Sequence, residues 1–299
     1  MRRQTAFLAV IVSAACFGTL AIITSLAYRA GAEPLPLLVW RFFVATLILG
    51  GYLLITRPSA LRVSRADLAR YVSIAVFGYG AASMCFFHAL KFTDASIVAV
   101  LLYTYPLMVV LVERVLNGTP LTPGKLTGVA TAFVGSVLVL GLVTGGGVQP
   151  LGIVLGLGAG VGYTVFTMLS HRWLPGRSRI TMMTFMFATN SVFMALVATV
   201  SGVNLSPLGW DLEVWVYVLA LVALPTVAAV VLYMRGISSM GPGQASIIST
   251  IEPVFTIALA CVFLGERLSA IQLIGATLVI AGVVVAERSA GRAEEIAAV

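Results

Sequence analysis

The chain has 299 residues, of which 60% are hydrophobic and only 10% are charged, whereas roughly 25% of residues are charged in an ordinary soluble domain. A soluble domain could not bury so much apolar surface, so the composition excludes a soluble globular protein and indicates a membrane protein. The formal net charge is +7, but the basic residues lie almost entirely between apolar segments. We therefore expect them to orient the chain in a membrane, and we expect no nucleic-acid partner.

Ten apolar segments are long enough to cross a membrane, which takes roughly 20 apolar residues each. They cover residues 5–28, 35–55, 67–90, 94–114, 122–143, 150–172, 179–200, 211–235, 242–264 and 268–287. Turn-forming residues separate them, for example at 117–120 and 241–243. The first segment is longer than the apolar core of a secretory signal, so we expect a retained helix. The sequence thus predicts an all-α integral membrane protein with ten transmembrane helices.

The basic residues between the segments predict the orientation of the chain. With the N-terminus in the cytoplasm, 14 Lys and Arg residues fall on the cytoplasmic side and only Arg29, Lys91 and Arg267 on the opposite side. This bias follows the positive-inside rule and places both termini in the cytoplasm, and we expect a multi-pass protein of the bacterial inner membrane. Arg41 falls inside the second segment, where it either snorkels to the interface or pairs with a carboxylate in the bundle. Glu113, at a helix end, is expected to be a solvated or interfacial charge.

Two halves of the sequence match at an offset of 147 residues. The matched residues include Pro106 with Pro253, Gly128 with Gly275, and Gly135 with Gly282. Each half has five predicted helices, an odd number, so the second half must enter the membrane in the opposite orientation. Many secondary transporters use such inverted repeats to place a substrate site at the midplane. We expect the first repeat at 1–146, the second at 147–288 and a cytoplasmic tail at 289–299.

A polar stripe lies along one face of the segment at 242–264. Its members are Ser246, Ser249, Thr250, Pro253 and Thr256. Glu252 lies at the edge of the stripe, about nine residues past Gly243 and hence roughly 13 Å along the helix, near the middle of the bilayer. A carboxylate there has to be protonated, paired or hydrated. Ser246, Ser249, Thr250 and Glu252 are therefore candidate substrate-binding residues, and Glu252 is also the candidate for proton coupling. The alternative is that Glu252 only bonds a neighbouring helix.

Three prolines are expected to bend membrane helices. Pro106 and Pro253 occupy equivalent positions in the two halves, and each frees the carbonyl four residues earlier, at Leu102 and Ser249. Pro225 adds a third kink. Free carbonyls near the midplane are good ligands for an ammonium group, so the three prolines are candidate gating residues. The alternative is that each kink only fits the packing.

Tyrosines and hydroxyls in two further segments are expected to line a cavity. Tyr79 and Ser83 share one face of the third segment, and Tyr163 and Thr167 share one face of the sixth. Aromatic walls with scattered hydroxyls suit a mid-sized, partly apolar ligand. The alternative for each residue is a hydrogen bond that only joins neighbouring helices.

The fourth segment carries two tyrosines, of which we expect one to line the cavity. Tyr103 and Tyr105 lie roughly 200° apart on a helical wheel, so they cannot both face the same cavity, and we choose Tyr103. His88, near the end of the third segment, lies on the face opposite to Tyr79. It is either a packing residue or a second candidate for proton coupling.

Sequence motifs of enzymes are missing. The chain has no H-E-x-x-H, G-x-S-x-G, P-loop or C-x-x-C motif. Cys16, Cys85 and Cys261 lie in apolar segments and lack the spacing of a disulfide framework or a metal site. We therefore expect no enzymatic activity, no cofactor and no bound metal, and any active transport has to be driven by a gradient.

Each half of the chain resembles an EamA domain of the drug/metabolite transporter superfamily, and together they cover nearly the full length. The residues that carry the resemblance are Trp40-Arg41-Phe42, Ile251-Glu252-Pro253-Val254-Phe255, Phe263-Leu264-Gly265-Glu266-Arg267-Leu268, Gln272-Leu273-Ile274-Gly275 and Ala281-Gly282-Val283. The first half departs from this pattern, because Tyr105 stands where the second half has Glu252, and Thr119-Pro120 where it has Glu266-Arg267. We therefore expect no symmetric role for the carboxylate.

The resemblance implies ten helices in two inverted repeats and a central cavity bounded by helices one, three, four, six, eight and nine. Within the family the chain is most similar to YddG-type aromatic amino-acid exporters. The expected function is export of aromatic or large neutral amino acids by alternating access, with membrane lipid as the other partner and a monomer as the assembly. One alternative is efflux of drugs or other small metabolites. An intramembrane enzyme or receptor is the other, but neither gives a reason for the inverted repeat.

Overall fold

The computed structural model describes residues 3–89, 92, 95–140, 149–264 and 269–297, so that Lys91, Glu266 and Arg267 lie outside the described residues. Within these ranges the regular structure is helical and contains no strand. The first half comprises α1 (Arg3–Arg29), α2 (Pro34–Thr56), η1 (Pro58–Leu61), α3 (Arg65–Ser73), η2 (Ile74–Gly80), α4 (Ala81–Ala89), α5 (Ala95–Leu102), α6 (Tyr105–Asn117) and α7 (Pro123–Leu140). The second half comprises α8 (Pro150–Trp173), α9 (Arg179–Val200), α10 (Leu212–Leu221), η3 (Val222–Ala228), α11 (Ala229–Met240), α12 (Pro242–Ser249), α13 (Glu252–Leu264) and α14 (Ala270–Ala297).

These elements confirm the predicted all-α membrane fold. Among the described residues, nine helical segments have the length and apolar composition to cross a membrane, and a shorter apolar helix at Pro123–Val139 corresponds to the fifth predicted span. Four of the described spans are composite: α3, η2 and α4 form the third, α5 and α6 the fourth, α10, η3 and α11 the eighth, and α12 and α13 the ninth. The last helix, α14, continues to Ala297, well past the predicted end of the tenth span.

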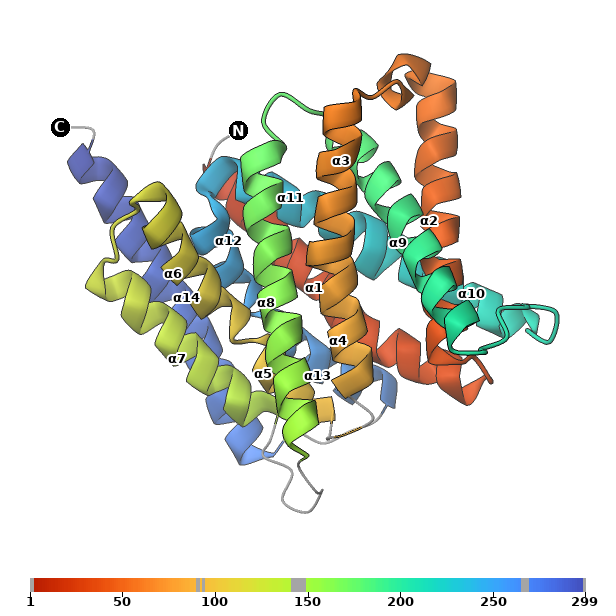
Figure 1. Cartoon of the computed structure of the whole chain (residues 1–299). Coiled ribbons are helices and arrows are strands. Elements are labelled where there is room, and N and C mark those ends of the chain that lie inside the picture. The colour runs from red at the N-terminus through yellow and green to blue at the C-terminus, as the bar shows by residue number, and fades with distance from the viewer. Residues whose placement is uncertain (1–2, 90–91, 93–94, 141–148, 265–268, 298–299) are drawn as a thin grey trace.

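The two halves run in opposite directions. In Figure 1, α1 runs from the upper end of the bundle to the lower end, whereas α8, the first helix of the second half, runs from the lower end to the upper end. The start of α1 and the end of α14 both lie toward the upper end. This arrangement is the inverted two-repeat fold that an odd number of spans in each half requires.

The fourth span of each half is broken at the same place. The first break lies at Tyr103–Thr104 and the second at Thr250–Ile251, an offset of 147 residues. At each break the backbone tightens to three-residue hydrogen bonds, with Thr104 N–H bonded to the Leu101 carbonyl and Ile251 N–H to the Ile248 carbonyl, both at 3.2 Å. Because the two breaks lie at equivalent positions, they are a shared feature of the two repeats.

Pro106 and Pro253 stand just after these breaks, each as the second residue of a new helix, α6 or α13. At the start of a helix the missing N–H of proline costs little, because that donor has no partner in the helix. Each proline therefore starts a new helical segment, where the sequence predicted a bend in a continuous one.

The third span of each half contains a wide π-helical turn. These turns are η2 and η3, which begin 148 residues apart. Pro225 lies inside η3, as the predicted kink requires, whereas η2 contains no proline. Irregular backbone at membrane depth is stable only where protein or a water-filled cavity surrounds it, and π turns are frequent at functional sites. The four irregular segments therefore mark the part of the bundle where a site is expected.

Helices α7 and α14 lie side by side at one edge of the bundle (Figure 1) and meet through four glycines. A Cβ atom on Gly135 would lie 2.6 Å from the backbone nitrogen of Val279 and 2.7 Å from the carbonyl oxygen of Gly275. Gly128 and Gly282 make the equivalent close approach further along. Small residues allow membrane helices to approach this closely, which explains the glycine pairs that match between the halves. We call this contact the glycine seam.

Polar contacts join the fourth, fifth, ninth and tenth spans at the end of the bundle that holds both termini. Lys125 Nζ lies 2.7 Å from Glu113 Oε2, with 12% and 8% of the two side chains exposed. Gln244 donates to Glu287 at 2.6 Å. Glu113 was expected to be a solvated or interfacial charge at a helix end; it is not solvated, because the start of α12 packs over its carboxylate at Gly243. The two polar contacts each join neighbouring spans of one half, and the packing of Gly243 against Glu113 brings the two halves together at this end.

Substitution of Lys125 by Met should destabilise this end. Glu113 would then stay buried without its partner, so we expect a loss of about 1–3 kcal/mol in the free energy of unfolding. Thermal unfolding of the purified protein in detergent measures the change. The double variant Glu113→Leu/Lys125→Met removes both charges and should recover most of the loss; a double variant no more stable than Lys125→Met would contradict the prediction.

Candidate functional site

Five aromatic side chains from both halves meet inside the bundle, and we call them the central aromatic cluster. They are Tyr79 of η2, Tyr105 of α6, Tyr163 and Phe166 of α8, and Tyr233 of α11. Ring centroids lie 4.7 Å apart for Tyr105 and Tyr163, 5.4 Å for Tyr163 and Phe166, 6.1 Å for Tyr163 and Tyr233, and 5.3 Å for Tyr79 and Phe166. The cluster thus joins the third, fourth, sixth and eighth spans, which the resemblance placed around the cavity.

The two helix breaks meet next to this cluster. Tyr103, at the first break, lies within electrostatic range of Glu252, the first residue of α13. Tyr105 lies close to Ser249, the last residue of α12. Among the described residues, no Lys or Arg forms an ion pair with Glu252. The half-buried carboxylate therefore has a neutral hydroxyl neighbour and, in this part of the chain, no cationic partner.

The expectation that Tyr103 and Tyr105 face different directions was wrong. Both side chains are at least 93% buried, at 7% and 3% exposure, and both belong to one hydrophobic cluster that Tyr163 also contacts. The helical wheel does not apply to them because α5 ends before Tyr103 and α6 begins at Tyr105. Tyr105 is thus a site residue that sequence reasoning missed, and the following Pro106 was the signal that the helix restarts there.

Several of the predicted hydroxyls bond within their own helix. Ser246 donates to the Gly243 carbonyl at 2.8 Å, Thr250 to the Ile247 carbonyl at 2.6 Å, and Ser83 to the Tyr79 carbonyl at 2.8 Å. Such bonds satisfy a hydroxyl in an apolar environment without a partner from another helix. Of the stripe and its edge, Ser249 and Glu252 are the residues that lie close to the tyrosines of the fourth span.

Thr167 connects the sixth and eighth spans. Its hydroxyl lies 2.9 Å from the Tyr163 carbonyl and 3.3 Å from the Tyr233 hydroxyl, and Tyr233 lies within electrostatic range of Tyr105. The hydroxyls of Thr167, Tyr233 and Tyr105 thus lie close together at the cluster. Tyr233 and Phe166 were not among the predicted site residues, because the sequence alone does not distinguish a site residue from a packing residue when an aromatic side chain lies in an apolar helix.

The His88 side chain forms a hydrogen bond within its own helix, in which Nδ1 lies 2.9 Å from the Met84 carbonyl oxygen. Its half-buried side chain makes no described contact with the central aromatic cluster. The structure thus brings Tyr79, Tyr103, Tyr163, Thr167, Ser249 and Glu252 together around the cluster and leaves His88 apart from it.

Arg41 contradicts both sequence expectations for its side chain. Only 4% of the residue is exposed, so it does not snorkel to the interface. Its Nε donates to the Thr226 hydroxyl at 2.5 Å, and its Nη2 lies 3.5 Å from the Tyr79 hydroxyl. Arg41 therefore joins α2 to both π turns through neutral oxygens, with no carboxylate involved.

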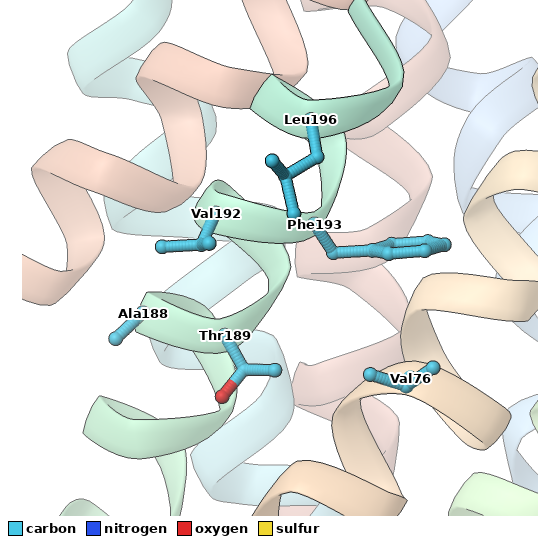
Figure 2. A pocket seen from close by; sticks show the side chains of 6 residues that line it. All are labelled: Val76, Ala188, Thr189, Val192, Phe193 and Leu196. Atoms are coloured by element: carbon cyan, nitrogen blue, oxygen red, sulfur yellow. The ribbon is translucent and has the colours of Figure 1, made fainter. Parts of the chain in front are cut away.

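A groove lies on another part of the bundle, between η2 and α9 (Figure 2). Its lining residues are Val76, Ala188, Thr189, Val192, Phe193 and Leu196. Val192 and Leu196 are each 61% exposed, so the groove opens on the outer surface, where lipid chains surround a membrane protein. It shares no residue with the central aromatic cluster.

Comparison with known proteins identifies the family. The EamA-like transporter family matches residues 4–141 and again residues 150–287. The transporter YcbK of Bacillus subtilis (strain 168), described as uncharacterized, is 26% identical over 277 residues, which cover 89% of this chain and 87% of that protein. An uncharacterized transporter of Archaeoglobus fulgidus is 25% identical over 281 residues, which cover 94% and 95% of the two chains.

A solved crystal structure has the same fold. It aligns with a TM-score of 0.82 at 23% identity, over 97% of this chain and 99% of that one. The relatives are named only as transporters, so they do not support the narrower resemblance to aromatic amino-acid exporters. With two family matches that together span most of the sequence, the chain belongs to the EamA-like transporter family and is a multi-pass membrane transporter.

Proposed function

We propose that this transporter exports amino acids with aromatic or large neutral side chains across the bacterial inner membrane by alternating access. The termini then lie in the cytoplasm, as the distribution of Lys and Arg favours. The substrate binds between the two repeats, at the central aromatic cluster.

The observation that carries this proposal is the central aromatic cluster next to a half-buried carboxylate, Glu252, that has no cationic partner among the described residues. Glu252 is half-buried in the bundle, and its carboxylate lies within electrostatic range of the neutral hydroxyl of Tyr103, with no ion pair to a Lys or Arg among the described residues. An ammonium group supplies the charge that a buried carboxylate needs. The rings of Tyr105 and Tyr163 offer the edges and faces on which an aromatic or large apolar side chain packs.

The irregular segments support alternating access. Each half places one broken span and one π turn beside the cluster, at equivalent positions. Discontinuous helices at the interface of inverted repeats are the usual place of a transporter's binding site. Segments without a continuous hydrogen-bond ladder also change conformation at lower cost than an intact helix, so the two halves can open the cluster in turn.

Uptake into proteoliposomes tests the proposal. We expect labelled phenylalanine to cross only when the protein is present and excess unlabelled large neutral amino acids to reduce the flux. Tyr163→Ala removes a central ring and should lower the flux about tenfold, which corresponds to about 1.4 kcal/mol of lost interaction. The matched control is Tyr52→Ala, because Tyr52 is 48% exposed on α2.

Two results would contradict the proposal. Flux of cationic dyes without flux of any amino acid would assign the protein to drug efflux. Equal amino-acid flux in the wild type and in Tyr163→Ala would separate transport from the central aromatic cluster.

A further inference from the structure

Arg41 holds a positive charge inside the bundle, and no carboxylate of the described residues pairs with it. The residue lies in α2 about seven residues after Pro34, roughly 10 Å along the helix, and the helices around it leave 4% of its surface exposed. In the described part of the chain, no Asp or Glu forms an ion pair with Arg41. A charge buried in this way is costly unless a partner neutralises it.

The neighbours of the guanidinium satisfy only part of its hydrogen-bonding capacity. A guanidinium has five N–H donors, and the described contacts are those of Nε with Thr226 and of Nη2 with Tyr79. Both acceptors are neutral hydroxyls. The Thr226 hydroxyl in turn donates to the Leu221 carbonyl at 2.6 Å, so it stays fixed in its role as an acceptor from Arg41.

A second polar group in the same place lacks a partner. The Tyr28 hydroxyl, near the end of α1, is buried and has no hydrogen-bond partner. It lies within electrostatic range of the Arg41 guanidinium. Buried hydroxyls nearly always have a partner, so this one signals a missing acceptor. The charged guanidinium of Arg41 on α2 and the hydroxyl of Tyr28 on α1 thus lie close together, and both have hydrogen-bond donors without an acceptor.

We propose that Arg41, together with the hydroxyls of Tyr28 and Tyr79, binds the carboxylate of the transported molecule. The assignment rests on the transport function proposed above and restricts its substrates to molecules with a carboxylate group. The planar fork of a guanidinium matches the two oxygens of a carboxylate, and a tyrosine hydroxyl donates to the same oxygens. The carboxylate also supplies the negative charge that the protein itself does not provide at this point.

The position of Tyr79 connects this carboxylate site to the central aromatic cluster. Its hydroxyl contacts Arg41, and its ring packs against Phe166, which packs against Tyr163. A substrate held at Arg41 by its carboxylate therefore places its apolar part over aromatic rings. Arg41 and Glu252 lie at opposite ends of this row of rings. The ammonium and carboxylate groups of an α-amino acid are attached to one carbon, so they cannot reach Glu252 and Arg41 at the same time. Glu252 and Arg41 therefore bind such a substrate one after the other.

Binding to the purified protein in detergent tests the site separately from transport. The probes are 3-phenylpropionate, its neutral amide and inorganic phosphate, and the readout is the rise in unfolding temperature with probe concentration. We expect the acid to stabilise the wild type and the amide and phosphate to have little effect. Arg41→Gln should abolish the stabilisation, and Arg41→Lys should weaken binding about tenfold, since an ammonium lacks the planar fork. The control is Arg29→Gln, because Arg29 is exposed at the end of α1.

Tyr28→Phe keeps the test decisive if the Arg41 variants do not fold. The change removes one oxygen that has no partner in the structure, so the unfolding temperature of the free protein should not fall. We expect the dissociation constant of 3-phenylpropionate to rise about tenfold, the effect of one hydrogen bond to a charged group. A residue with only a structural role would change the stability of the free protein and leave this constant unchanged.

Several outcomes would overturn the carboxylate site. With the wild type, these are equal stabilisation by the acid and by its amide, or stronger stabilisation by phosphate than by the acid. With the variants, the contradicting result is that folded Arg41→Gln or Tyr28→Phe binds the acid as tightly as the wild type does. Arg41-dependent binding of the acid without amino-acid flux in proteoliposomes would refute the proposed transport function and support the site. Amino-acid flux in the wild type combined with unchanged acid binding in Arg41→Gln would refute the site alone.

Discussion

Replacement of Glu252 by Gln should reduce amino-acid flux by about 10- to 100-fold, the value of one charge-assisted hydrogen bond. The amide keeps the size of the side chain and an oxygen that accepts from Tyr103, but it carries no negative charge for an ammonium group. It also cannot take up or release a proton. The flux that remains should therefore lose its dependence on pH, and uptake in proteoliposomes on either side of neutral pH measures both effects.

Tyr103→Phe is the matched control for this variant. It removes the hydroxyl that lies within electrostatic range of Glu252 but keeps the carboxylate. We expect a smaller loss of flux, with the dependence on pH preserved. Full flux and an unchanged pH dependence in Glu252→Gln would show that the carboxylate neither binds the substrate nor couples transport to protons, and that it only joins the fourth and ninth spans.

A leucine at Gly135 should disrupt the fold more than any single change proposed above. Its Cβ would meet the backbone of α14, 2.6 Å from the Val279 nitrogen and 2.7 Å from the Gly275 carbonyl oxygen. Backbone atoms cannot move aside as the end of a side chain can, so α7 and α14 have to separate. Overpacking in well-packed interiors typically costs 1–3 kcal/mol, and we expect about 3 kcal/mol or more here.

The unfolding temperature and the fraction of monodisperse protein after purification in detergent measure this effect. Gly51→Leu is the control, because Gly51 lies in a membrane helix with no atom of another residue within 4 Å of its added Cβ. We expect this control to remain as stable as the wild type. A Gly135→Leu protein of unchanged stability would mean that the glycine seam is not closely packed in the membrane.

The sequence predicts the number, order and direction of the spans well, because each depends on a local property. Apolar runs of sufficient length mark the spans, and five spans in each half impose the inversion. The proline pair at 106 and 253 also indicates where the fourth span of each half is irregular. Nothing in residues 74–80 predicts the π turn of the first half, since the turn lies in an apolar stretch without proline.

The candidate site is less predictable because it depends on contacts between distant segments. A helical wheel assumes one continuous helix, and the break at Tyr103–Thr104 removes that assumption for Tyr105. The partners of Arg41 are separated from it by 38 and 185 residues in the sequence. Its presence as a lone charge within a span was the available signal, but its partners could only be known from the packing of three spans.

The glycine seam has a consequence for how the molecule moves. The same residues of both repeats build it, with Gly128 facing Gly282 and Gly135 facing Gly275, so the seam lies on the pseudo-twofold axis that relates the halves. When two related halves exchange their shapes, points on the axis that relates them stay in place. Under the proposed alternating access, we therefore expect the seam to move least and the rearrangement to be concentrated in the spans on the other side of the bundle.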